Sequence, residues 1–505
     1  MSGNLFTRFV AQHWRDSQPF IHGVDGRTLS YGDTRHVSAQ LAHALVELGM
    51  RPGDRVVVQV EKSATALLLY LASLRAGAVY VPLNSAYTLA EVEYFVSDAE
   101  PTLVVCAPEQ YAAISALITA PHTRVVTLSA DGQAGSLLTT AAEHDTVFVD
   151  VERSEQDLAA ILYTSGTTGR SKGAMLTHGN LASNCFVLKD VWQYSATDVL
   201  LHALPIFHTH GLFVATNVTL ATGASMIMLP KFDSALIQRF LPRATILMGV
   251  PTFYTRLLQE PWLNTDSTAH MRLFVSGSAP LLADTHRQWR ERTGHAILER
   301  YGMTETNMNT SNPYHGERVP GTVGLPLPDV SIRIVDLEHG MPLATGEIGM
   351  IEVKGPNVFC GYWRMPEKTQ AEFRDDGFFI TGDIGKIDAH GYVHIVGRGK
   401  DLIISGGFNV YPKEIETELD ALPDVLESAV IGVAHPDFGE GVTAVVIARS
   451  GQELNEAAIM QRLRERLAAY KLPKRIIVVS DLPRNAMGKV QKNVLRQMYA
   501  DLYEL

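Results

Sequence analysis

Short, nearly uninterrupted runs of β-branched and aliphatic residues limit what this chain can fold into. The runs occupy residues 55–60, 102–107, 124–128, 224–230, 244–250 and 272–277. Strands without an alternating polar face are typical of sheets that are covered on both faces. Amphipathic segments such as residues 64–76 and 283–293 lie between these runs, so the sequence predicts an α/β fold of layered helices and sheets.

The character of the sequence changes after about residue 330. Glycine and proline become closely spaced there, and short alternating strands are expected at residues 331–336 and 348–355. From residue 397 onward a strand, a glycine turn and a helix starting near Pro412 lead into alternating strands and a helix over 456–469. Because a chain of 505 residues exceeds one ordinary core, we expect two domains, residues 1–397 and 398–505.

The composition is that of a globular protein that acts on small molecules. With 46% hydrophobic and 19% charged residues, the chain resembles neither a disordered nor a fibrous protein. A formal net charge of −11 argues against nucleic acid or an anionic membrane as the main partner. The three cysteines share no metal-type spacing, and we find neither a signal peptide nor an apolar run long enough to cross a bilayer. We expect a cytoplasmic protein.

Residues 163–173, with the sequence YTSGTTGRSKG, follow a strand-like segment and form the most informative motif. They combine three glycines, five serine or threonine residues and two cations. Glycines let the backbone approach an anion, and exposed N–H groups and hydroxyls donate to phosphate oxygens. No Walker A pattern fits the segment. It therefore predicts a polyphosphate cradle of another kind, with a flexible Ser/Gly-rich linker as the alternative.

Four more motifs follow in order: YGMTE at 301–305, TGD at 381–383, GRGKD at 397–401 and PRNAMGK at 483–489. Together with the glycine-rich segment they resemble the adenylate-forming superfamily of acyl-CoA synthetases, carrier-protein adenylation domains and luciferases. The resemblance implies a large N-terminal domain of two stacked α/β subdomains and a small β-barrel-like one, then a mobile α+β C-terminal domain. It also implies that a carboxylate and ATP give acyl-AMP and pyrophosphate, that coenzyme A then displaces AMP, and that Mg²⁺ is required.

The resemblance assigns the nucleotide site residue by residue. Asp383 is the acceptor for the ribose hydroxyls, Arg398 is its partner, and the ring of Tyr301 offers a face to the adenine. The implied ATP-binding positions are Thr164, Ser165, Gly166, Thr167, Thr168, Gly169, Lys172, Ser278, Ala279, Pro280, Glu299, Tyr301, Gly302, Thr304, Asp383 and Arg398.

By the same resemblance, Lys489 bridges the carboxylate and the α-phosphate. A carboxylate is a poor nucleophile toward a polyanion, so the reaction needs cations placed where charge develops. Thr304 offers a hydroxyl to the α-phosphate, and Glu305 supplies the hard oxygen that Mg²⁺ prefers. The alternative for Thr304 and Glu305 is an ordinary pair of first-turn helix residues.

The resemblance makes Lys400 a hinge residue between the domains. One orientation brings Lys489 to the site, and the other brings Gly406 and Gly407, which line a channel for the thiol of coenzyme A. An ordinary tight turn is the alternative for the two glycines. The superfamily lysine at the position of Lys489 is an acetylation target, so a lysine acetyltransferase and a deacetylase are possible partners.

Arg300, in the stretch LERYGMTE, indicates the acid that is activated. Many relatives carry Gly or Ala there, and a buried guanidinium disfavours a neutral acyl tail unless an anion pairs with it. Arginine also fits a carboxylate with two parallel hydrogen bonds. Together with HTHGL (208–212) and VPTFYTRLL (250–258), the stretch looks closest to malonyl-CoA synthetases. This implies malonate, with methylmalonate as a further substrate, and the pocket residues His208, Thr209 and Met308; His208 is also placed beside the α-phosphate.

Several alternatives to this interpretation of Arg300 stay open. Arg300 could be a surface residue on a solvated turn, or it could pair with Glu299. Arg256 could hold the second carboxylate instead. The substrate could be another short acid such as acetate or oxalate, or a longer acyl group, and the acceptor could be a carrier protein.

Overall fold

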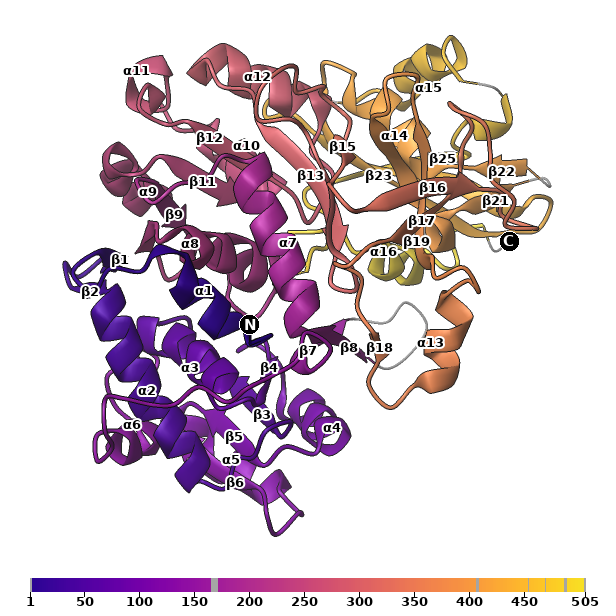
Figure 1. Cartoon of the computed structure of the whole chain (residues 1–505). Helices are drawn as coiled ribbons and strands as arrows, with labels where there is room; N and C mark the ends of the chain where they lie inside the picture. Colours follow the sequence, from indigo (N-terminus) through magenta and orange to yellow (C-terminus); the bar gives the residue numbers. More distant parts are fainter. Residues whose placement is uncertain are drawn as a thin grey trace.

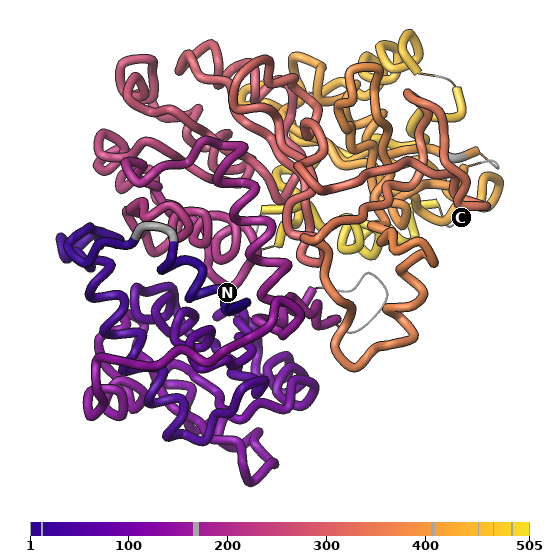
Figure 2. The backbone as a smooth tube through the Cα atoms, in the orientation of Figure 1, coloured from indigo at the N-terminus to yellow at the C-terminus, as the bar shows by residue number. Residues whose placement is uncertain are grey.

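The structure of this chain, a computed structural model, describes residues 2–164, 171–405, 408–452, 454–467, 469–485 and 488–503. Figure 1 shows the first α/β layer (indigo to purple), a second one beside it (magenta to pink), and the orange and yellow C-terminal part on the other side of the second layer. Figure 2 traces the same path along the backbone. The predicted α/β fold is confirmed.

A seven-stranded sheet forms the centre of the first layer, in the order β18-β8-β7-β4-β3-β5-β6. Strands β4, β3, β5 and β6 run parallel, as does the pair of β4 and β7, and β8 and β18 are antiparallel additions. The bounds are β3 Arg55–Gln59, β4 Val79–Pro82, β5 Leu103–Cys106, β6 Arg124–Thr127, β7 Leu158–Thr164, β8 Lys172–Thr177 and β18 Gly361–Tyr362.

A nine-stranded sheet forms the second layer, in the order β15-β14-β13-β12-β11-β9-β10-β1-β2. Its bounds are β1 Pro19–Gly23, β2 Thr28–Ser30, β9 Val199–His202, β10 Ser225–Met228, β11 Ile246–Gly249, β12 Leu273–Ser276, β13 Leu298–Met303, β14 Asn307–Ser311 and β15 Leu325–Pro326. All six apolar runs that the sequence predicted as strands are strands of these two sheets. Each run is apolar because the sheets are covered on both faces.

Helices cover the sheets, and α3 is buried along nearly its whole length, from Thr65 to Arg75. The sequence suggested an amphipathic segment at residues 64–76, and the structure corrects this: a helix that is apolar all round belongs in a core, and α3 packs against α1 and α2. The helices of the first 397 residues are α1 Leu5–His13, α2 Tyr31–Glu47, α3 Ala64–Arg75, α4 Leu89–Ala99, α5 Tyr111–Leu117, α6 Ser136–Ala141, α7 His178–Val191, α8 Asn217–Thr222, α9 Ser234–Phe240, α10 Pro251–Leu257, α11 Thr265–Thr268, α12 Ala283–Thr293 and α13 Pro366–Glu372.

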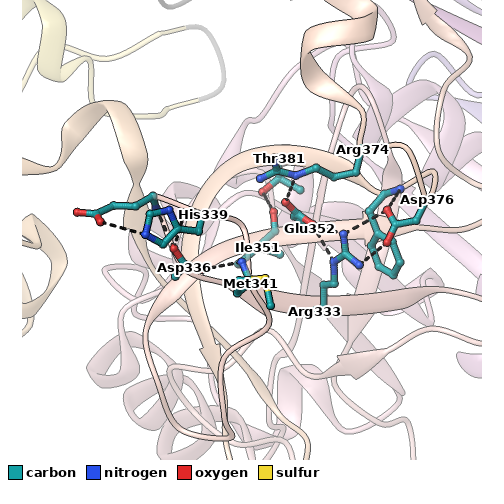
Figure 3. Close-up of polar contacts among 11 residues, drawn as sticks. Arg333, Asp336, His339, Met341, Ile351, Glu352, Arg374, Asp376 and Thr381 are labelled. Carbon is teal, nitrogen blue, oxygen red and sulfur yellow. Dashed lines mark hydrogen bonds and ion pairs between the residues drawn. The ribbon is translucent and has the colours of Figure 1, made fainter.

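A four-stranded antiparallel sheet follows, in the order β16-β17-β19-β20, with bounds β16 Ser331–Val335, β17 Gly349–Lys354, β19 Phe379–Ile387 and β20 Val393–Arg398. Glu352 is fully buried in it and accepts hydrogen bonds from Arg333 at 2.8 Å and Arg374 at 2.7 Å. Figure 3 shows this cluster beside Thr381, whose hydroxyl donates to the carbonyl of Ile351. The two ion pairs tie β16 and β17 to the segment that leads into β19.

The C-terminal part is built around strands β21 Ile403–Ser405, β22 Phe408–Val410, β23 Val425–His435, β24 Gly439–Ala448 and β25 Arg475–Val479, with helices α14 Pro412–Asp420, α15 Glu456–Arg464 and α16 Lys492–Met498. Two apolar clusters fill it, and their described members all come from residues 403–503. This separate core supports our proposal of two domains, 1–397 and 398–505.

Across the described ranges, no helix is both long enough and apolar enough to pass through a membrane.

Candidate active site

Strand β13 carries the central residues of the candidate site. It pairs in parallel with β12, where Glu299 lies opposite Ser276, and antiparallel with β14, where Gly302 lies opposite Met308. The sequence suggested a glycine turn over these residues. The structure corrects this, because the strand extends to Met303 and the turn comes only at residues 304–306. Arg300 is therefore a strand residue, and the alternative of a solvated turn is wrong.

Three predicted nucleotide residues meet at one end of the site. The hydroxyl of Tyr301 donates to Oδ2 of Asp383 at 2.5 Å, and Nε of Arg398 lies 2.6 Å from Oδ1. Strands β19 and β20 place Asp383 directly opposite Arg398. Burial and the adjacent carboxylate raise the pKa of Tyr301 well above its usual value, so the phenol stays protonated and donates its hydrogen bond.

Lys489 also lies at the site, on a loop that rests against the N-terminal part. A Cβ on its neighbour Gly488 would lie 2.9 Å from the hydroxyl oxygen of Thr252, at the start of α10. Arg484 braces the loop, because it donates to the carbonyl of Gly488 at 3.0 Å. Burial, followed by the charge of Arg398, lowers the pKa of Lys489 to about 8.

A second cluster joins Lys172 to Glu305 and includes two residues that the sequence did not reveal. Nζ of Lys172 lies 3.3 Å from Oε1 of Glu372 and 4.1 Å from the ring centroid of Tyr362. The hydroxyl of Tyr362 lies 2.6 Å from Oε2 of Glu372 and 3.1 Å from Oε1 of Glu305. The cluster forms because β18 pairs with β8. No local sequence motif predicts such a contact.

Glu305 fits the Mg²⁺ ligand that the resemblance implies. Its side chain is 5% exposed, and its backbone carbonyl is fixed by the N–H of Phe359 at 2.7 Å. Burial raises the pKa of this carboxyl, so its charged form gains from a cation. Carboxylate oxygen is the donor that Mg²⁺ prefers, and bound Mg²⁺ would neutralise part of the charge on the phosphates.

Arg300 is buried, and none of the described residues forms an ion pair with it. The residue is 3% exposed, and its Nε and Nη2 atoms have no hydrogen-bond acceptor in the part of the chain that the structure describes. Burial lowers its pKa to about 9. Glu299 compensates it only in part: its charge raises the pKa of Arg300 but burial outweighs that effect, Oε1 of Glu299 accepts the N–H of Leu281, and neighbouring residues on a strand point to opposite faces. Arg256 is an exposed residue of α10, so it does not take the place of Arg300.

His208 and His210 lie next to Arg300. Nδ1 of His208 accepts the N–H of His210 at 3.2 Å, and Nδ1 of His210 lies 3.2 Å from the hydroxyl of Ser278. Burial, then the charges of Arg300 and Lys489, lower the pKa of His208 to about 4, and burial and Arg300 also lower the pKa of His210. Both rings are therefore neutral at pH 7. Arg300 is the cation that can pair with a second carboxylate.

Thr209 and Met308, which were expected to flank the substrate, are also buried. Thr209 is 1% exposed, and its hydroxyl has no partner within the described segments. Met308 is 2% exposed, and its Cε would lie 2.7 Å from a Cβ on Gly302. Their contact with the substrate stays a prediction.

The remaining predicted residues have these positions. Thr164 ends β7, Ala279 and Pro280 follow β12, Thr304 lies in the turn after β13, and Lys400 lies in a short 3₁₀ helix of residues 399–401. The predicted phosphate-loop residues Ser165, Gly166, Thr167, Thr168 and Gly169 and the channel residues Gly406 and Gly407 lie outside the described residues.

Known sequence families match most of this chain. The family described as AMP-binding enzyme matches residues 7–363, and the one described as AMP-binding enzyme C-terminal domain matches residues 414–489. This chain belongs to the AMP-binding enzyme family. The second match ends at Lys489, the lysine that the structure brings to the site.

This AMP-binding enzyme has close structural relatives. It shares 61% sequence identity with MatB from Rhodopseudomonas palustris, over 100% of both chains. The TM-score is 0.98 against the ATP-bound crystal structure and 0.88 against the apo crystal structure of that protein. This structure is therefore more similar to the ATP-bound structure of MatB than to the apo structure.

Two curated relatives of the AMP-binding enzyme also cover nearly its full length. Malonate–CoA ligase ACSF3, mitochondrial, from Mus musculus is 36% identical over 93% of this chain and 87% of the relative. Feruloyl-CoA synthase from Amycolatopsis sp is 36% identical over 95% of both chains.

Proposed function

We propose that this AMP-binding enzyme is an ATP-dependent malonyl-CoA synthetase. The chain is an acid–CoA ligase, as its family and full-length relatives are. In the proposed reaction malonate attacks the α-phosphate of ATP to give malonyl-AMP and pyrophosphate, and the thiol of coenzyme A then displaces AMP. The observation that carries the choice of malonate is the buried, unpaired guanidinium of Arg300.

The energetics of Arg300 favour a dicarboxylate over a neutral acid. A pKa lowered from 12.5 to about 9 corresponds to a cation destabilised by about 5 kcal/mol. A bound carboxylate recovers part of that energy, whereas an apolar tail leaves the charge buried and unpaired. The neutral His208 and His210 beside it add no competing charge. The charges of Arg300 and Lys489 both lower the pKa of His208, so both cations lie near one side chain, which favours a short acid.

The other site residues take the roles that the resemblance implies. We propose that Lys489 and Thr304 act on the α-phosphate, that Glu305 holds Mg²⁺, and that Asp383 and Arg398 hold the ribose. Support comes from the burial of these carboxylates beside cations and from the position of the Lys489 loop against α10.

The transfer step needs a second arrangement of the domains. We propose that Lys400 is the hinge, and that its rotation brings Gly406 and Gly407 to the thiol path in place of Lys489. The separate apolar clusters within residues 403–503 support a C-terminal domain that moves as a unit.

We further propose a cytoplasmic enzyme whose Lys489 is acetylated and deacetylated. The three cysteines are free, which suits a reducing compartment. A pKa of about 8 for Lys489 gives a larger fraction of neutral amine at pH 7 than an ordinary lysine has, and the neutral amine is the nucleophile in acetyl transfer.

The proposed function is tested by product analysis. The protein is incubated with ATP, Mg²⁺, coenzyme A and one acid at a time: malonate, methylmalonate, acetate or oxalate. We expect malonyl-CoA and AMP in equal amounts, identified by mass spectrometry and chromatography. Turnover of acetate without turnover of malonate would overturn the proposal, and AMP release that does not depend on coenzyme A would favour a carrier-protein acceptor.

A further inference from the structure

Gly277, the first residue after β12, lies directly against the guanidinium of Arg300. A Cβ built on Gly277 would lie 2.5 Å from Nη1 and 2.6 Å from Nε of Arg300, and it would be nearest to Cζ. All three nearest atoms thus belong to one planar group. The guanidinium occupies the space that any side chain at position 277 would need.

The backbone conformation of Gly277 does not itself require glycine. Its φ lies outside the left-handed region, since Gly277 is absent from the positive-φ glycines of the chain. Its N–H donates to the carbonyl of Gly249 at 3.3 Å, a contact that alanine preserves. The steric demand on position 277 therefore comes from Arg300.

Arg300 has little room to move away. The residue is 3% exposed, and its charge acts on the neighbouring side chains of His208, His210 and Tyr254. Tyr254 is itself fixed, because its hydroxyl donates to the carbonyl of Val275 at 2.6 Å. A methyl group at position 277 must therefore displace the guanidinium, and a clamp for a carboxylate loses its function when displaced by about 1 Å.

We infer that Gly277 is a specificity-determining residue, which seats the Arg300 guanidinium so that it can bind the second carboxylate of the substrate. The inference rests on the proposed function. It assigns the selectivity for a dicarboxylate to two residues. Arg300 on β13 supplies the cation, and Gly277 after β12 leaves space for its guanidinium because it has no side chain.

The test is a double-mutant cycle of Gly277→Ala with Arg300→Ala. The substrates are malonate and isovalerate, in which an isopropyl group replaces the second carboxylate at nearly the same size. Gly277→Ala should lower kcat/KM for malonate by about 30-fold and leave the KM for ATP within about twofold. In the Arg300→Ala background the same substitution should change kcat/KM for malonate by less than about twofold.

Gly249→Ala provides the matched control. Gly249 lies beside Ser276 on the adjacent strand, and a Cβ there would meet the ring of Phe253 at 2.9 Å instead of Arg300. Gly249→Ala should change kcat/KM for malonate by the same factor in the wild-type and Arg300→Ala backgrounds. If Gly277→Ala also changes kcat/KM for malonate equally in both backgrounds, Gly277 does not position the Arg300 guanidinium.

Thermal unfolding separates this inference from the proposed function. Gly277→Ala should lower Tm by about 2–4 °C in the wild-type background and leave it unchanged in Arg300→Ala, whatever acid the enzyme uses. If the enzyme does not turn over malonate but Gly277→Ala lowers Tm only in the presence of Arg300, the proposed function is refuted and the steric contact between Gly277 and Arg300 is supported. An enzyme that makes malonyl-CoA but shows equal losses of Tm and of kcat/KM in both backgrounds would refute the role of Gly277 alone.

Discussion

Lys489 should control the first half-reaction and give it a characteristic pH dependence. Burial and Arg398 lower the pKa of Lys489 to about 8, and the reaction with the α-phosphate needs the charged ammonium. Raising the pH from 7 to 9 therefore reduces the charged fraction about tenfold. We expect kcat/KM for malonate-dependent exchange of pyrophosphate into ATP to fall by about the same factor, because this parameter reports pKa values of the free enzyme.

Two variants separate the charge of Lys489 from its position. Lys489→Met should reduce the exchange by about 10³-fold, the loss expected when one placed donor is removed, and should change thioester formation from supplied malonyl-AMP by less than about threefold. Lys489→Arg keeps its charge above pH 8, so the fall of the exchange near that pH should disappear. If kcat/KM of the exchange falls at the same pH in Lys489→Arg as in wild type, the charge of Lys489 does not set the pH dependence. If Lys489→Met loses both half-reactions equally, Lys489 is not specific to the first.

Three further substitutions test other parts of the structure. Asp383→Asn should raise the KM for ATP about tenfold or more, because it leaves the half-buried Arg398 without its charge partner; ATP-dependent initial rates measure this, and an unchanged KM would contradict a nucleotide role. Tyr362→Phe should raise the Mg²⁺ concentration for half-maximal activity a few-fold, since its hydroxyl holds Glu305, and an unchanged Mg²⁺ dependence would speak against that link. Asp198→Asn should lower the free energy of unfolding by about 3 kcal/mol, because the buried Asp198 pairs with Arg272 at 2.6 Å; urea denaturation tests this, and kcat should not change.

Features set by local sequence could be predicted well. The helix expected at residues 283–293 has the same bounds as α12, because its amphipathic period needs no distant partner. The helix expected at 456–469 instead ends at Arg464. Helix ends depend on capping and packing more than on the apolar period.

Features set by strand pairing could not be predicted from local sequence. A solvated turn was the alternative for Arg300 because Gly302 follows it closely, yet pairing with β12 and β14 makes the segment a strand. Glu372 meets Lys172 only because β18 joins the sheet beside β8. The contact between Gly277 and the Arg300 guanidinium depends on the pairing of β12 with β13. No sequence motif at either position predicts it.

The ordered motifs did identify the residues that gather at the site. Tyr301, Asp383 and Arg398 lie far apart in the sequence and form one hydrogen-bonded group in the structure. Lys489 comes from the C-terminal domain and still reaches His208 and Arg398 electrostatically. Their grouping follows from the resemblance of the ordered motifs to the superfamily, whereas apolar periodicity alone does not predict it.

The proposed pairing of Arg300 with the second carboxylate of malonate can be measured through kcat/KM for malonate and for isovalerate, with wild type and with Arg300→Leu. We expect wild type to prefer malonate strongly, and Arg300→Leu to reduce the malonate-to-isovalerate ratio of kcat/KM at least about 100-fold, which corresponds to about 3 kcal/mol of coupling. An equal loss for both acids, with the ratio unchanged, would show that Arg300 does not bind the second carboxylate.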